Sequence, residues 1–132
     1  MRRLTLGLVT AAMSAAGMVA MSQGPAVAQA AADLPTLVAE GARLYANNCA
    51  PCHGATGAGG AGPPIQGNVY MASISAVLNQ IFLGNAERGM PMFTRLTDRE
   101  VAAISNYIRN SMGNAYPDLV TLEAAAATRP PG

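Results

Sequence analysis

Apolar residues recur at helical spacing in three stretches of this chain, and two stretches rich in glycine and proline separate them. The first helical stretch begins within residues 33–36, with Pro35 suited to a first turn, and runs to residues 47–48. Its apolar face consists of Leu37, Gly41, Leu44 and Tyr45. Because glycine inside a helix costs ~1 kcal/mol relative to alanine, Gly41 indicates that another backbone comes close.

The second and third stretches also predict amphipathic helices. The second has apolar residues at i, i+3, i+4, i+7 and i+8, namely Ile74, Val77, Leu78, Ile81 and Phe82, and Gly84 is a natural stop after them. The third begins with the capping box Thr97-Asp98-Arg99-Glu100, and we expect it to end at Gly113. Its expected buried face is Val101, Ile104, Tyr107 and Ile108. No stretch alternates as a strand does, so we predict an all-α fold of three to four helices.

Residues 54–67 and 84–96 lack periodicity, and we expect both to be irregular loops. The first loop has two interpretations, a flexible linker or an ordered segment packed against a ligand. We favour the ordered segment because glycine lets a backbone approach a ligand closely. It does not end in Gly-Lys-Ser or Gly-Lys-Thr, which excludes a phosphate-binding loop of that type.

The candidate chemistry lies in Cys49-Ala50-Pro51-Cys52-His53, which holds both cysteines and the one histidine of the sequence. Two thiols on one helical turn can add across the two vinyl groups of a haem, and the next residue can then ligate the iron through its imidazole. A thiol–disulfide redox pair, half of a zinc site and a chance occurrence are the alternatives. Zinc needs more ligands than the chain offers, and a redox pair of the thioredoxin type needs a βαβ context that is not visible.

A second axial ligand would decide whether such a haem moves electrons or binds small molecules. The candidates after the first 30 residues are methionines, because no other histidine exists: Met71, Met90, Met92 and Met112. Met112 is suited to core packing. Met90 lies in a loop between Gly89 and Pro91, and the proline favours an extended backbone that projects the sulfur to a fixed point. Met90 is therefore favoured as an iron ligand, with Met92 second.

Residues 1–30 read as a cleaved secretory signal peptide. Arg2 and Arg3 precede an apolar run from Leu4 to Met21, and small residues at 28–30 or 26–28 suit a signal peptidase. A retained membrane anchor is the alternative, because the run is nearly long enough to span a bilayer. We expect removal of the signal, no stable membrane insertion afterwards, and a periplasmic location. The remaining chain divides into a domain at 31–115 and a tail at 116–132 with a short Ala-rich segment.

Charge excludes several classes of partner. Removal of Arg2 and Arg3 leaves six arginines against seven acidic residues, a formal charge of −1, and the chain contains no lysine. Nucleic acids and anionic membranes need clustered basic residues, so neither is an expected partner, and a docking face ringed with lysine is excluded. With two Phe, four Tyr and no Trp, a large apolar cofactor would supply interior that a small domain otherwise lacks.

Several segments carry a family resemblance over roughly residues 37–113: Gly41-Ala-Arg-Leu-Tyr45, Cys49-Ala-Pro-Cys-His53, Gly62-Pro-Pro-Ile65, Gly89-Met-Pro-Met-Phe93, Leu96-Thr-Asp-Arg-Glu-Val101 and Asn106-Tyr-Ile108. In this order they resemble a class I c-type cytochrome, of the small periplasmic monohaem kind. The resemblance implies a cytochrome c fold with crossing N- and C-terminal helices, in which Gly41 and Tyr45 pack near Tyr107.

The resemblance also implies the roles of the site residues. Cys49 and Cys52 would hold one haem c covalently, His53 and Met90 would ligate its iron, and the Pro63 carbonyl would accept the other imidazole N–H. Whether Tyr70 or Arg88 reaches the haem propionates stays open.

We accordingly expect an electron carrier rather than an enzyme. Its redox partners would be a periplasmic dehydrogenase or reductase as donor and a terminal oxidase or another cytochrome as acceptor. A dedicated subunit of a periplasmic dehydrogenase has similar weight, and a haem enzyme or gas binder with an open sixth site is the less favoured alternative.

Overall fold

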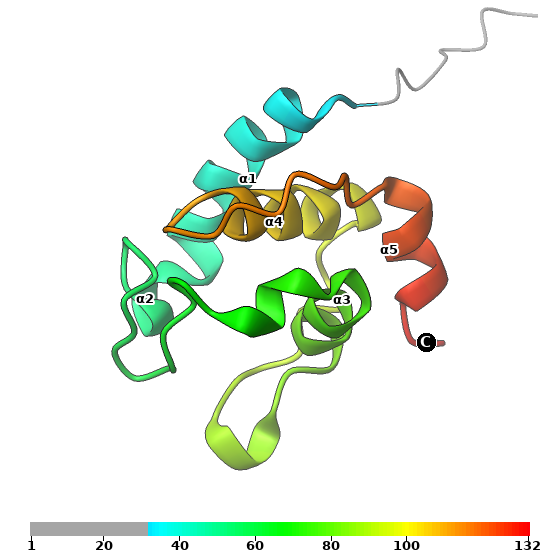
Figure 1. The fold of residues 1–132 in the computed structure, drawn as a ribbon. Coiled ribbons are helices and arrows are strands. Elements are labelled where there is room, and N and C mark those ends of the chain that lie inside the picture. Colours follow the sequence, from blue (N-terminus) through cyan, green and yellow to red (C-terminus); the bar gives the residue numbers. More distant parts are fainter. Residues whose placement is uncertain (1–31) are drawn as a thin grey trace, which may run out of the picture. The chain divides into compact units, whose positions relative to one another are not determined.

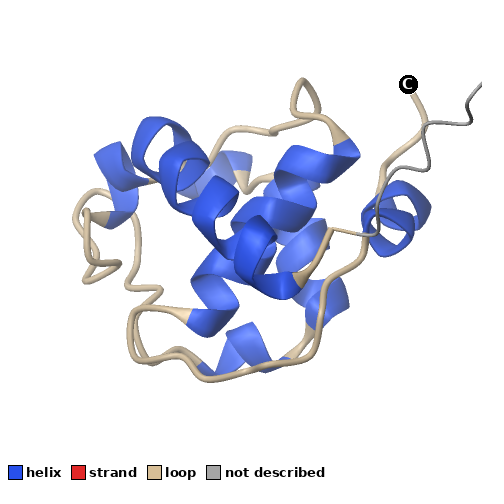
Figure 2. Cartoon of the chain, turned by 90° about the horizontal axis from the view of Figure 1, so that it is seen from above, coloured by secondary structure: helices blue, strands red, loops and turns tan. Residues whose placement is uncertain are grey.

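The computed structural model describes residues 32–132, so the signal peptide expected at 1–30 lies outside the described residues. Helices and loops make up this part of the chain, and the only β-type pairing within it is an isolated bridge between Asn85 and Met90 (Figure 2). The elements in chain order are α1 (Leu34–Asn48), α2 (Ala50–His53), the 3-10 helix η1 (Val69–Ala72), α3 (Ile74–Leu83), the 3-10 helix η2 (Ala86–Arg88), α4 (Asp98–Asn110) and α5 (Leu122–Thr128). The prediction of an all-α fold is confirmed. The described residues contain five α-helices, because the single turn α2 and the tail helix α5 add to the three periodic stretches.

The crossing of α1 over α4 is the closest helix pairing in the fold (Figure 1). At the crossing, a Cβ added to Gly41 would collide with the Ala103 carbonyl oxygen and would lie 2.7 Å from Tyr107 Cβ. The rings of Tyr45 and Tyr107 are 5.4 Å apart and tilted. The close backbone approach predicted from Gly41 is therefore present, and α4 is the helix that approaches.

Local signals set where most helices begin. Asp33 accepts a hydrogen bond from the Thr36 amide at the start of α1, and Thr97 and Glu100 form both bonds of the predicted capping box at the start of α4. The predicted end of α4 is wrong, because the helix stops at Asn110 and the next residue, Ser111, has an extended backbone. Three residues beyond Ser111, the buried Asn114 donates to the carbonyls of Ile65 and Ile108, and these bonds hold the chain in its new direction after the helix.

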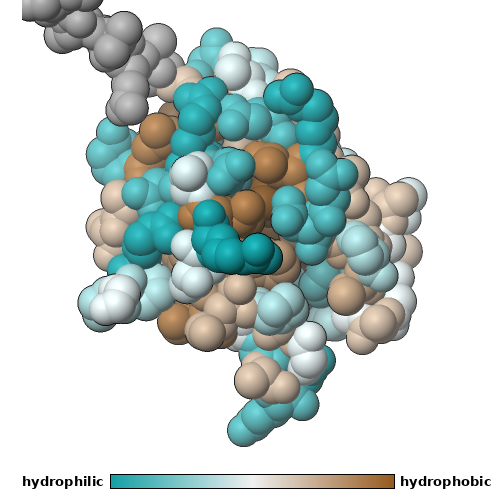
Figure 3. Space-filling view, turned by 180° about the vertical axis from the view of Figure 1, so that it is seen from behind, coloured by the Kyte–Doolittle hydropathy of each residue, from teal (hydrophilic) through white to brown (hydrophobic). Residues whose placement is uncertain are grey.

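The core centres on α4, which α1, α3 and α5 cover. Residues 111–121 return along α4, and α5 then packs against its N-terminal half (Figure 1). Val120 and Ala125 of this tail are fully buried in the same core as Val101 and Phe82. Seen from behind Figure 1, the surface shows apolar residues bordered by hydrophilic ones (Figure 3).

Candidate haem site

The turn α2 carries the two thiols and the imidazole. Cys49 ends α1 and precedes α2, and its carbonyl accepts hydrogen bonds from the amides of Cys52, at 3.1 Å, and His53, at 2.9 Å. Cys52 is exposed, Cys49 is half-buried, and neither is in a disulfide. Both sulfurs are therefore available on one turn, as two thioether bonds to one haem require.

The surroundings of Cys49 keep its thiol protonated. Burial, followed by the nearby Cys52, raises the pKa of the Cys49 thiol to about 11. Cys49 is therefore not an activated thiolate nucleophile, which needs a lowered pKa. A zinc site is unsupported, since no three His, Cys, Asp or Glu side chains gather around a common point within residues 32–132.

The imidazole of His53 is held in one orientation. Its Nδ1 lies 2.8 Å from the Pro63 carbonyl oxygen, so Nδ1 carries the proton and donates it, and Nε2 keeps its lone pair for a metal. This is the contact that the family resemblance implies for Pro63. Gly62 packs against the same ring, since an added Cβ would lie 2.9 Å from Cε1 and 3.0 Å from Nδ1.

The loop at 54–67 is folded back onto α2 by backbone hydrogen bonds. Gly62 donates to the Cys52 carbonyl at 2.9 Å, and Gly59 donates to the His53 carbonyl at 2.8 Å. Burial, and then the nearby Cys49, raises the pKa of Tyr45 to about 12, so its hydroxyl stays protonated and donates to the Gly54 carbonyl at 2.8 Å. These bonds support the ordered-loop interpretation over the flexible linker.

A second loop presents Met90. The backbones of Asn85 and Met90 exchange two hydrogen bonds of 2.9 Å, which closes the loop around η2. Gly84 has a positive φ of 62°, and a Cβ there would lie 2.5 Å from the carbonyl oxygens of Met90 and Pro91. The sequence predicted Gly84 only as a helix stop; the structure shows that it also admits the Met90 backbone.

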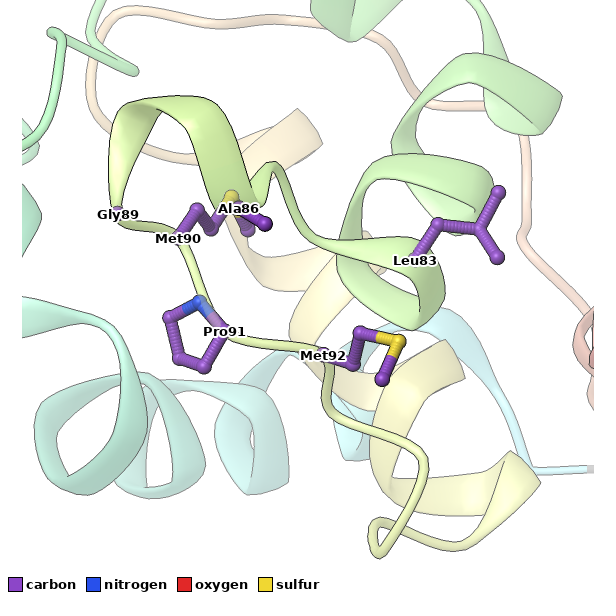
Figure 4. Close-up of a pocket in the computed structure, with 6 residues that line it drawn as sticks. All are labelled: Leu83, Ala86, Gly89, Met90, Pro91 and Met92. Atoms are coloured by element: carbon purple, nitrogen blue, oxygen red, sulfur yellow. The ribbon is translucent and has the colours of Figure 1, made fainter.

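The four candidate methionines differ in their surroundings. Met71 and Met112 pack against the core, whereas Met92 is 64% exposed. Met90 is half-buried, and the Gln80 amide donates to its sulfur at 3.3 Å, a contact that sequence reasoning missed. Met90 and Met92 leave the loop in different directions (Figure 4) and line an open cavity with four neighbours, Leu83, Ala86, Gly89 and Pro91.

The residues present fit a covalently bound haem. They supply two thiols on one turn, an imidazole with a free Nε2 and a thioether sulfur from a different loop. Large apolar side chains in the flanking segments are more than half exposed, and these are Val69, Tyr70, Leu83 and Met92. Of these, Leu83 and Met92 line the same open cavity as Met90. Tyr70 and Arg88, the open candidates for propionate contacts, are both exposed.

Helices around an attachment turn of this geometry define a c-type cytochrome domain. The family model described as cytochrome C oxidase, cbb3-type, subunit III matches residues 36–108, and the chain belongs to this family of cytochrome c domains. A search of curated proteins gives no match. The family confirms the predicted cytochrome c fold and the covalent c-type haem, and it makes the protein a haem-based electron carrier. None of the described helices has the length and apolar character needed to cross a membrane.

Proposed function

We propose that this protein is a periplasmic one-electron carrier with a single haem c held by Cys49 and Cys52, ligated by His53 Nε2 and Met90 Sδ. When bound, the haem supplies a ferric–ferrous couple. The observation that carries the proposal is the 2.8 Å contact between His53 Nδ1 and the Pro63 carbonyl, on the turn that presents both thiols. It orients the imidazole, fixes its tautomer and raises its basicity toward a metal.

Met90 is the proposed distal ligand on two grounds. It is the half-buried methionine of a loop whose backbone is closed by the pair with Asn85, whereas Met71 and Met112 are occupied in core packing. A methionine sulfur paired with histidine raises the reduction potential, which suits an electron carrier.

The test compares Met90→Ala with the matched control Met92→Ala, two residues away in the same loop. Both proteins are exported from a host that attaches c-type haem, and a haem stain on a denaturing gel reports covalent attachment. We expect Met90→Ala to keep the haem, to lose the six-coordinate low-spin spectrum, to bind carbon monoxide quickly and to have a lower potential. Met92→Ala should match the wild type. The reverse result would assign the ligand to Met92, and rapid carbon monoxide binding by the wild type would indicate an open sixth site.

The proposed location rests on the signal peptide expected at 1–30, the redox partners on the cytochrome c family, and the apolar docking on the absence of lysine from the sequence. The donor would be a periplasmic dehydrogenase or reductase and the acceptor a terminal oxidase or another cytochrome. Docking would be small and transient, through mainly apolar contacts. Sequencing the N-terminus of the exported protein tests the location, and a start near residue 31 is expected.

Stable association with a larger redox complex is the second candidate. The description of the family names an oxidase subunit, and the sequence also resembles the cytochrome subunits of periplasmic dehydrogenases near residues 107–114. Size-exclusion chromatography of a mild extract from the native host separates the candidates. A haem-stained band at the monomer mass supports the carrier, and a band at high mass together with dehydrogenase or oxidase activity supports the subunit.

A further inference from the structure

The tail after α4 is locked to that helix by a buried amide. The Asn106 side chain donates to the Val120 carbonyl at 2.8 Å and accepts from the Val120 amide at 2.9 Å. Both Asn106 and Val120 are fully buried. This pair of bonds fixes the chain just before α5 and therefore fixes where α5 places its last residues.

Arg129 directly follows α5, and its side chain reaches the segment that follows the Met90 loop. Its guanidinium donates to the Thr94 carbonyl at 2.9 Å, to the Leu96 carbonyl at 2.6 Å and to Asp98 Oδ1 at 2.6 Å. The same guanidinium lies over the Phe82 ring, with 4.7 Å between Cζ and the ring centroid. One side chain thus holds both arms of the loop, since Phe82 precedes Met90 and Thr94 follows it.

Other hydrogen bonds also hold the loop. The pair between Asn85 and Met90 closes the loop upon itself, and the Phe93 amide donates to the Ile81 carbonyl at 3.1 Å. The Gln80 amide of α3 donates to the Gly84 carbonyl at 3.0 Å and to the Met90 sulfur at 3.3 Å. Most residues of the loop from Ala86 to Met92 are exposed. Gln80 thus holds the arm before Met90, and the bonds from Arg129, with the Phe93 bond, fix the arm after it.

We propose that Arg129 is a positioning residue for the distal ligand: through the tail, it keeps the loop in the arrangement that presents Met90. This inference rests on the proposed ligation by Met90. An added ligand such as imidazole binds to the iron only in the fraction of molecules in which the sulfur has left. Loss of charge-assisted hydrogen bonds should raise that fraction, and with it the apparent affinity for imidazole, by roughly tenfold or more.

The experiment uses ferric holoprotein of the full chain and the variants Arg129→Gln and Arg129→Lys, with Arg99→Gln as the matched control. Arg99 is also partly exposed and also bridges two elements, since it binds Glu40 of α1 at 2.9 Å, but it does not hold the Met90 loop. Imidazole affinity and the far-red sulfur–iron charge-transfer band are measured at constant pH, and global stability is measured separately with denaturant.

We expect both Arg129 variants to bind imidazole at least roughly tenfold more tightly than the wild type, and Arg99→Gln to leave the affinity unchanged. Lysine should fail to rescue, because a single ammonium cannot reproduce the three-point guanidinium contact. Wild-type affinity in Arg129→Lys, or an equal rise in Arg99→Gln, would overturn the inference by showing that charge or global stability is the cause. If the wild type has the sulfur–iron band and Arg129→Gln binds imidazole no more tightly than the wild type, the role of Arg129 is overturned while the ligation by Met90 stands. A wild type without that band would overturn the Met90 ligation as well.

Discussion

Gly62→Ala offers a direct test of how the imidazole is held. A Cβ at position 62 would lie 2.9 Å from His53 Cε1 and 3.0 Å from Nδ1. Comfortable separations between carbon atoms are about 3.5–4.0 Å, so either the ring or the loop must move by more than about half an ångström. Because Nδ1 is bonded to the Pro63 carbonyl at 2.8 Å, a shift of that size would lengthen or break the bond.

The expected cost combines two effects. Overpacking costs about 1–3 kcal/mol, and a weakened hydrogen bond adds about 0.5–1.5 kcal/mol. Together they predict a loss of stability of about 2–4 kcal/mol, which for a domain of this size lowers the melting temperature by on the order of 10 °C. The imidazole would also become a less basic ligand, so the ferric state loses stabilisation and the reduction potential should rise.

The assay compares thermal unfolding and the reduction potential of the holoprotein in Gly62→Ala and Gly67→Ala. Gly67 lies in the same loop with a positive φ of 58°, and no atom lies within 4 Å of an added Cβ. Gly67→Ala should therefore be destabilised through backbone strain alone, with an unchanged potential. If Gly62→Ala has the potential of the wild type, or behaves as Gly67→Ala does, the reasoning about the His53–Pro63 bond is refuted.

Three further predictions concern the tail and the surface. Arg109→Met should lower the free energy of unfolding by about 2–4 kcal/mol in denaturant titrations. The reason is that the fully buried guanidinium donates to the Met71 carbonyl at 2.8 Å and to the Asp118 carbonyl at 2.7 Å. A loss of stability no larger than that of Arg99→Gln would contradict this prediction. The hydrogen bond from Arg109 lowers the pKa of Asp118 from its ordinary 3.8, so Asp118 contributes stability above that pH and loses it as the pH falls through the lowered folded pKa. Asp118→Asn should therefore flatten the acid-unfolding profile, and an unchanged profile would count against the pair. Without lysine, the rate of electron transfer to a partner should depend only modestly on ionic strength in stopped-flow measurements, and a steep fall would indicate a charged docking face.

Sequence patterns were reliable where the physical cause is local. The capping box at Thr97 and Glu100 and the apolar spacing of α3 concern residues within a few positions of one another. The attachment motif is equally local, since two thiols and an imidazole need only one turn to come together. The family resemblance placed Pro63 beside His53, and the structure has that contact at 2.8 Å.

The tail shows where such patterns fail. No sequence pattern singles out Arg109 or Arg129. Arg109 is nevertheless fully buried, and Arg129 bonds to Asp98 and to the Thr94 carbonyl, 31 and 35 positions away. The position of Asn106 on α4 among apolar residues was the available signal, because a buried amide needs partners. The end of α4 was misplaced for a related reason, since the bond from Asn114 to Ile65 spans 49 positions.

Local patterns in the amino-acid order were enough to predict the helices, the turn that carries the thiols and imidazole, and the four candidate methionines. How the tail closes over α4, which glycine borders the imidazole and which side chains hold the Met90 loop became visible only in the folded chain. Helical periodicity and capping depend on neighbours within about one turn, so one segment contains them in full. Contacts between distant segments exist only after the chain has folded, when nearly every buried polar group has to find a hydrogen-bond partner.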